Sequence, residues 1–146
     1  MGLQNLDFDF GSNGQHGCEA IDFGTASDID ERFCYWKGAS GTGYIHTAYS
    51  LIDVPELPKV NYVLVYRDEQ GRRHPLRIGR TQDKAGSLNL AEIRQRAARL
   101  GANEVHVHLI SETSRDRALV ECDLRAGQFR SLSSERRMPG AGTVLN

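Results

Sequence analysis

The sequence has few cysteines and no long apolar stretch, and both shortages exclude classes of protein. Its three cysteines, Cys18, Cys34 and Cys122, are widely spaced and form no C-x-x-C pair. This argues against a disulfide framework and against a cysteine-based zinc site. We therefore expect Cys34 and Cys122 to be small core residues. No apolar run approaches the roughly 20 residues that a membrane helix needs.

The N-terminal stretch MGLQNLDFDFGSNG lacks the basic and apolar segments of a secretory signal. We therefore expect a cytoplasmic protein that makes no contact with a membrane.

Lysine is scarce, and one end of the chain has no basic residue at all. The sequence contains three Lys and fifteen Arg, and an excess of Arg suits bidentate recognition of phosphate or carboxylate. Residues 1–31 carry seven acids and no Lys or Arg, so residues 32–146 have about six positive charges in excess. Composition favours a flexible acidic arm over 1–31, either a solvated tail or a segment that shields a basic face or binds a partner protein.

Two β-hairpins are expected from alternating, β-prone residues. Residues 60–67 and 74–80 flank a polar turn whose Gly71 can adopt a positive φ. Residues 33–36 and 44–51 form a second pair around a glycine-rich tip, which we expect to be flexible. A proline-containing linker follows the second pair, so that residues 32–58 form one unit.

Two helices and one further strand follow the hairpin at 59–81. The first helix is expected at 90–100, with Asn89 and Glu92 as a capping box and Gly101 as the C-terminal stop. A strand at 104–110 alternates cleanly. Thr113 caps the second helix, with Asp116 at its third position, and we expect this helix to end near Gly127 and residues 128–146 to form a tail. The order predicts an α+β fold with a β-β-α-β-α core over 59–127 and a small, mostly antiparallel sheet.

The core resembles the GIY-YIG nuclease fold over about residues 60–124, on the strength of NYV in its first strand and RIG closing the second. The resemblance implies that Tyr62 corresponds to the first motif tyrosine and that Ile78 and Gly79 end the second motif. It further implies a helix arginine at Arg94 or, as the less favoured choice, Arg96. Glu121 would be the catalytic carboxylate that holds a divalent metal such as Mg²⁺.

Two departures from the family pattern favour binding over cleavage. Val60 stands in place of the motif glycine, and Arg77 stands in place of the second tyrosine. An arginine stays charged at every accessible pH and cannot transfer a proton. Positive side chains on the hairpin and first helix form a plausible phosphate track, namely Arg72, Arg73, Arg77, Arg80, Arg94 and Arg96.

Each candidate also has a purely structural interpretation. Glu121 lies four residues from Arg117 and from Arg125, which is the spacing of ordinary helical ion pairs. His106 and His108 share a strand face, where we expect them to be half-exposed, although a metal site completed by His46 or His74 is an alternative.

The leading hypothesis is a nucleic-acid-binding protein, with DNA as the favoured partner and a degenerate GIY-YIG-like core. The first alternative is an active Mg²⁺-dependent endonuclease that uses Tyr62, Arg94 and Glu121. The second is a non-enzymatic protein-interaction module that uses the acidic arm or the glycine-rich hairpin tip.

Overall fold

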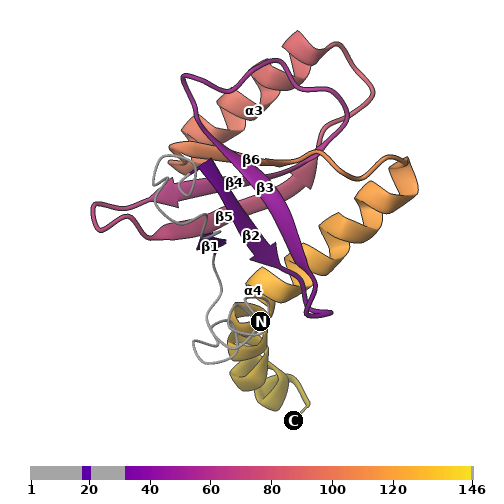
Figure 1. Cartoon of the computed structure of the whole chain (residues 1–146). Helices are drawn as coiled ribbons and strands as arrows, with labels where there is room; N and C mark the ends of the chain where they lie inside the picture. Colours follow the sequence, from indigo (N-terminus) through magenta and orange to yellow (C-terminus); the bar gives the residue numbers. More distant parts are fainter. Residues whose placement is uncertain (1–17, 21–31, 146) are drawn as a thin grey trace, which may run out of the picture.

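A six-stranded antiparallel sheet with one helix on each face forms the protein in our computed structural model, which describes residues 18–20 and 32–145 (Figure 1). The strand order across the sheet is β1-β2-β3-β6-β4-β5. The strands are β1 (Cys18–Ala20), β2 (Phe33–Lys37), β3 (Gly43–Ser50), β4 (Asn61–Arg67), β5 (Arg73–Arg80) and β6 (Glu104–His108), and the helices are α3 (Gly86–Leu100) and α4 (Ser114–Leu145). The predicted α+β class and the β-β-α-β-α order of the core are confirmed.

Strand β6 joins the two predicted hairpins into one sheet, because it pairs with β3 on one side and with β4 on the other. The central hairpin turns where the sequence predicts. Gly71 has a φ of 84° and donates its N–H to the carbonyl of Asp68 at 2.9 Å. The N-terminal hairpin is therefore part of the same layer as the core.

The two helices bury opposite faces of the sheet. Ile93 and Ala97 of α3 pack on one face, with Tyr62 and Leu64 beneath them. On the other face, Val120 and Leu124 of α4 belong to a cluster with Cys34, Trp36, Val63, Val65 and Ile78. With both faces covered, residues 61–65 of β4 are all buried, so residues 62–65 form a continuous apolar run and do not alternate with polar residues.

Helix α3 starts earlier than the sequence indicates. Its N-cap is Ala85, which makes no side-chain capping bond, so the predicted capping box is wrong. Asn89 is buried within the first turn and donates from Nδ2 to the carbonyls of Leu57 and Gln82, at 3.1 and 3.2 Å. It ties the helix to the preceding loops. The predicted stop is confirmed, since Gly101 is left-handed and donates its N–H to the carbonyl of Ala97.

Helix α4 begins as predicted but runs through Leu145, so its expected end near Gly127 is wrong, as is the extended tail. The Thr113 cap is confirmed by a hydrogen bond from the Asp116 N–H to Thr113 Oγ1 at 3.0 Å. Gly127 lies against the tip of the β2–β3 hairpin, where an added Cβ would come within 2.6 Å of the carbonyl oxygen of Lys37. The glycine serves a close approach between backbones.

The glycine-rich tip is fastened to α4 through Asp123. The carboxylate accepts hydrogen bonds from the hydroxyl of Ser40 at 2.6 Å and from that of Tyr44 at 2.7 Å. Burial tends to raise the pKa of Asp123, but these bonds outweigh it and hold that pKa below its usual value. Burial and the neighbouring carboxylate raise the pKa of Tyr44 to about 12.

The acidic arm lies outside the described residues apart from β1, which pairs with β2 at the edge of the sheet. No helix in the described part of the chain combines the length and the apolar character that crossing a membrane requires.

Candidate functional site

A cationic cleft of about 460 Å³ lies at the outer edge of the sheet, around strand β5 and beside both helices. Two carboxylates, Asp83 and Glu121, line it together with six positive side chains, which leaves four positive charges in excess. The six are Lys59, Arg77, Arg80, Arg96, Arg117 and Arg125. They come from segments that lie far apart in the sequence, so the tertiary fold assembles this charge.

Tyr62 is the aromatic group of the cleft, and its position depends on two neighbours. The side chain is only 1% exposed, and its hydroxyl accepts a hydrogen bond from Nη1 of Arg96 at 3.1 Å. Gly79, its partner across the β4–β5 pair, leaves room for the ring, because an added Cβ would be 2.7 Å from the hydroxyl oxygen. The cleft therefore holds a phenol with a guanidinium directly on its oxygen.

Glu121 is held between two arginines on the α4 side of the cleft. Its Oε1 accepts from Nε of Arg80 at 2.6 Å, and its Oε2 lies 3.1 Å from Nη2 of Arg125. Arg125 also donates from Nε to the carbonyl of Ile78 at 3.0 Å. Each carboxylate oxygen thus already has a cationic partner.

Arg117 is a buried cation without a carboxylate. It is 6% exposed, and its guanidinium donates to the carbonyls of Ser111 and Glu112 and to Oγ of Ser114. These acceptors are neutral, and no acid forms an ion pair with Arg117 among the described residues. A buried charge is costly unless an opposite charge compensates it. Arg117 is therefore a buried cation at the cleft whose charge no described carboxylate balances.

Two further features add to the positive character of the cleft. The side chain of Arg77 is exposed and has no hydrogen-bond or ion-pair partner within the part of the chain that the structure describes. Ser114, the first residue of α4, lines the cleft. The positive end of the helix dipole favours negative charge at such a position.

The fold brings together five of the residues singled out in the sequence: Tyr62, Arg77, Arg80, Arg96 and Glu121. Arg94 lies elsewhere, with its guanidinium on the carbonyls of Leu51 and Ile52. Arg72 pairs with Asp68 in the hairpin turn, and Arg73 pairs with Glu104. Of the two candidate helix arginines, the less favoured Arg96 is the one beside Tyr62.

The sequence pattern predicted neither Lys59 nor the cleft roles of Arg117 and Arg125. The signal for the arginines was present in their spacing, since residues 117, 121 and 125 recur every four residues on one helix face. The ion pair expected between Glu121 and Arg125 is present, whereas Arg117 turns away to the carbonyls before the helix. Only the partners of Arg117 distinguish it from an ordinary helical pair.

Glu121, the carboxylate that the resemblance assigns to a metal, does not fit a Mg²⁺ ion. Mg²⁺ requires carboxylate oxygens that are free to coordinate it, but both oxygens of Glu121 face arginines. Across the described residues, the one group of three potential metal-donor side chains lies elsewhere and consists of Cys18, Cys34 and His106.

That second group overturns the expectation from the cysteine spacing. Cys18 and Cys34 form a disulfide between β1 and β2, with their Cα atoms 5.8 Å apart. A metal ion would need both thiolates, and the disulfide removes them. Cys34 is buried as expected, but Cys122 is exposed, so its predicted core position is wrong.

The histidines of β6 are buried and not half-exposed as predicted. His106 is fully buried beside the disulfide, and His108 is 5% exposed with its Nδ1 2.7 Å from the carbonyl of Ile45. Side chains of the neighbouring strands surround these rings. Trp36 and the Cys34 sulfur contact His106, and the rings of Tyr44 and His46 pack against His108. Burial lowers the pKa of both His46 and His106, so both rings are neutral near pH 7.

Comparison with known proteins gives no relative: the chain matches no protein-family model, no curated protein and no solved structure.

Proposed function

We propose that this protein binds nucleic acid by holding backbone phosphates in the cationic cleft around β5. The observation that carries the proposal is Arg117, a buried guanidinium that has only neutral partners among the described residues. A phosphate oxygen would supply the missing negative charge. Arg77 offers a second guanidinium that no described residue engages, and the start of α4 adds its dipole.

The resemblance to the GIY-YIG fold supports this proposal but does not carry it. Tyr62, Arg96 and Glu121, three residues that the resemblance singles out, line the same cleft. We propose a degenerate centre that binds and does not hydrolyse, since both oxygens of Glu121 are occupied by arginines. DNA is the favoured ligand because the family to which the core is similar acts on it.

Fluorescence anisotropy with labelled oligonucleotides tests the proposal. Single-stranded and duplex DNA are each titrated across a series of salt concentrations, with a mononucleotide as a competitor. Binding should weaken steeply as the salt concentration rises. The logarithm of the binding constant should fall against the logarithm of the salt concentration with a slope near −3.6 if about four phosphates of a duplex are contacted. Absence of binding to both DNA forms at low salt would refute the proposal. Equal competition by the mononucleotide would show that the ligand is a small phosphate compound.

The endonuclease alternative is tested on the same preparations. Supercoiled plasmid is incubated with Mg²⁺, and the wild-type chain is compared with the Glu121→Ala variant. We expect no nicking from either. Mg²⁺-dependent nicking that disappears in Glu121→Ala would favour an active endonuclease over a binding protein. Nicking that survives the substitution would point to a contaminating nuclease.

The protein-interaction alternative has less support within the described residues. The hairpin tip, one of its two candidate surfaces, is already bound to Asp123 of α4. The other candidate surface, the acidic arm, lies mostly outside the described residues. A pull-down that compares the full chain with one lacking residues 1–31 tests the arm directly.

A further inference from the structure

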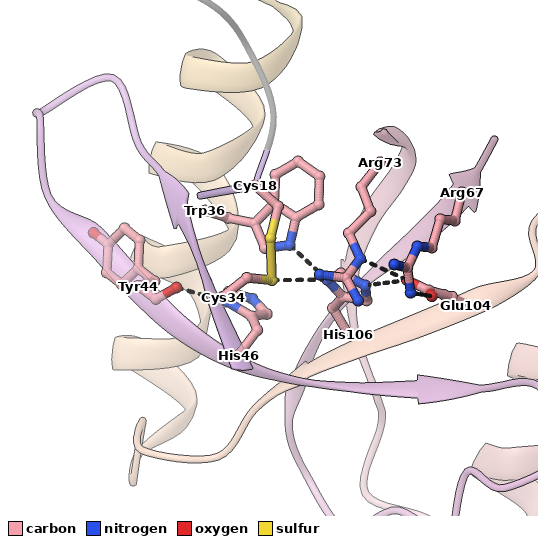
Figure 2. The surroundings of a disulfide bond; sticks show 9 residues. All are labelled: Cys18, Cys34, Trp36, Tyr44, His46, Arg67, Arg73, Glu104 and His106. Atoms are coloured by element: carbon pink, nitrogen blue, oxygen red, sulfur yellow. Dashed lines mark hydrogen bonds and ion pairs between the residues drawn. A yellow bond between two sulfur atoms is a disulfide. The ribbon is translucent and has the colours of Figure 1, made fainter. Parts of the chain in front are cut away.

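The disulfide between Cys18 and Cys34 lies at one end of a series of polar contacts that runs from strand to strand (Figure 2). The series continues through His106 and Glu104 to Arg73. Cys34 is fully buried on β2, whereas Cys18 on the edge strand β1 is only partly buried. Nδ1 of His106, on β6, lies 3.3 Å from the Cys34 sulfur. The two sulfurs therefore differ in access, and the inaccessible one has an imidazole beside it.

The hydrogen bonds of His106 fix which of its nitrogens carries the proton. The indole Nε1–H of Trp36 donates to Nδ1 at 2.9 Å, so Nδ1 bears the lone pair. Nε2 lies 2.8 Å from Oε1 of Glu104, and it is therefore the protonated nitrogen. The lone pair of the imidazole is thus held toward Trp36 and the Cys34 sulfur.

Glu104 forms ion pairs with two arginines of the neighbouring hairpin. Arg73 Nε lies 2.9 Å from Oε1, and Arg67 Nη1 lies 3.5 Å from Oε2. Burial tends to raise the pKa of Glu104, but its hydrogen bond with His106 and the charge of Arg73 lower that pKa to about 2. The Glu104 carboxylate therefore contacts the His106 imidazole, which in turn contacts the Cys34 sulfur. This order of groups is the one that activates a nucleophile.

We propose that Cys18 and Cys34 form a redox-active pair, in which Cys34 is activated by His106 and Glu104 and which exchanges with low-molecular-weight thiols and disulfides. A disulfide that only fastened β1 to the sheet would need neither a base nor a carboxylate. Buried polar chains of this kind are costly unless every member is satisfied. This activity is independent of the nucleic-acid site, because the two sites share no residue.

Reduction begins at the accessible sulfur. An external thiolate attacks Sγ of Cys18, the S–S bond breaks, and Cys34 leaves with the electron pair. His106 passes the proton released by the external thiol to the Cys34 sulfur. A second external thiol attacks the external sulfur of the mixed disulfide and releases Cys18. The Cys18 sulfur takes the second proton. One protein disulfide and two thiols thus become two protein thiols and one external disulfide.

Oxidation runs through the same atoms in reverse. The Cys34 thiol gives its proton to Nδ1 of His106, replacing Trp36 as the partner of that nitrogen. The thiolate attacks Cys18 in its mixed disulfide, and the expelled external thiolate takes the proton from the imidazolium. Glu104 stabilises the imidazolium while it exists, because its carboxylate faces Nε2–H.

The first experiment measures exchange in a glutathione redox buffer. The full chain carries Cys122→Ser, because Cys122 is an exposed free thiol. Thiols are counted by maleimide labelling and mass spectrometry as the buffer becomes more reducing. We expect the pair to open and close reversibly while circular dichroism stays native. A disulfide that resists reduction until the protein unfolds would overturn the proposal.

The second experiment identifies the sulfur that is attacked. With Cys34→Ser, oxidised glutathione should form a stable adduct on Cys18. With Cys18→Ser, the adduct on the buried Cys34 should form on the order of tenfold more slowly. Equal rates of adduct formation at the two cysteines would overturn the assigned direction of attack.

The third experiment separates proton transfer from structural support. His106→Gln keeps a polar side chain but removes the base, and reoxidation should slow by about 100-fold. His46→Gln is the matched control, because His46 is equally buried on the same sheet face and hydrogen-bonds to the carbonyl of Tyr44. His46→Gln should leave the reoxidation rate unchanged. A similar loss of rate in both variants would show that His106 acts only by packing, and would overturn the proposed relay.

Discussion

The phenol of Tyr62 lies directly against Gly79 of the neighbouring strand: a Cβ at position 79 would be 2.7 Å from the hydroxyl oxygen and 2.9 Å from Cζ. Two residues that the sequence analysis selected for their motif positions are thus coupled by packing. The coupling explains why a strand position that faces the cleft carries no side chain.

Gly79→Ala should therefore disturb both the fold and the cleft. Tyr62 is almost fully buried and cannot move aside freely, so we expect a loss of about 1–3 kcal/mol in the free energy of unfolding. Urea denaturation measures the loss. Tyr62→Phe is the control, since it removes only the hydroxyl and its bond from Arg96, at a cost of about 1 kcal/mol. A Gly79→Ala variant as stable as the wild type would contradict this packing.

Arg77 and Arg72 offer a matched pair on one hairpin for testing nucleic-acid binding. Arg77 lines the cleft without a partner among the described residues, whereas Arg72 lies outside it and pairs with Asp68. Arg77→Gln should weaken DNA binding and reduce the salt slope by about 1. Arg72→Gln removes the same charge and should change either quantity much less. Equal effects in anisotropy titrations would mean that net charge, and not the cleft, governs binding.

Glu104 should make the stability of the protein depend on acid pH. Its pKa is about 2 in the folded protein, against an ordinary value of 4.5. The stabilisation is thus complete above pH 4.5 and is lost as the pH falls toward 2. At pH 7, Glu104→Gln should cost about 1–2 kcal/mol after allowance for solvent screening.

Denaturation curves between pH 2 and pH 7 check this prediction. The stability of Glu104→Gln should fall less steeply than that of the wild type below pH 4.5. Glu69→Gln, in the exposed turn of the central hairpin, is the control and should follow the wild type. Parallel curves for the wild type and Glu104→Gln would rule out this carboxylate as the source of the acid sensitivity.

The effect of Gly127→Ala on stability distinguishes two roles of the glycine, a weak helix former and a residue that allows a close backbone approach. If helix propensity alone mattered, alanine within α4 would stabilise the protein by up to about 1 kcal/mol. The added Cβ would instead lie 2.6 Å from the carbonyl oxygen of Lys37 and 2.7 Å from the N of Ala39. Because these are backbone atoms, they cannot rotate away, and we expect a loss of about 1–3 kcal/mol.

Thermal and urea unfolding measure the effect of Gly127→Ala. Ala126→Gly, at the exposed neighbouring position, is the control for propensity and should cost about 1 kcal/mol. An increase in the stability of Gly127→Ala would mean that the hairpin tip can move away from α4.

Features governed by near neighbours in the sequence were predictable. The Gly71 turn, the Thr113 cap and the Gly101 stop each depend on residues within a few positions, and all three are confirmed. The strand pattern likewise predicted β4, β5 and β6 in order. Where a distant segment competes with the local signal, the prediction failed. Asn89 binds the carbonyl of Leu57 instead of capping a helix, and Gly127 accommodates a hairpin tip instead of ending one.

The α+β class, the order of the core elements and the abundance of arginine follow from the sequence alone. The sequence left undecided which charges would meet, because that depends on strand order and on the rotation of each helix about its axis. Arg94 and Arg96 differ by two positions, yet only Arg96 reaches Tyr62, since α3 must bury Ile93 and Ala97. The disulfide, the buried His106 and the unpaired charge of Arg117 are likewise products of tertiary structure. Each arises because residues far apart in the chain pack together and exclude the water that would otherwise solvate them.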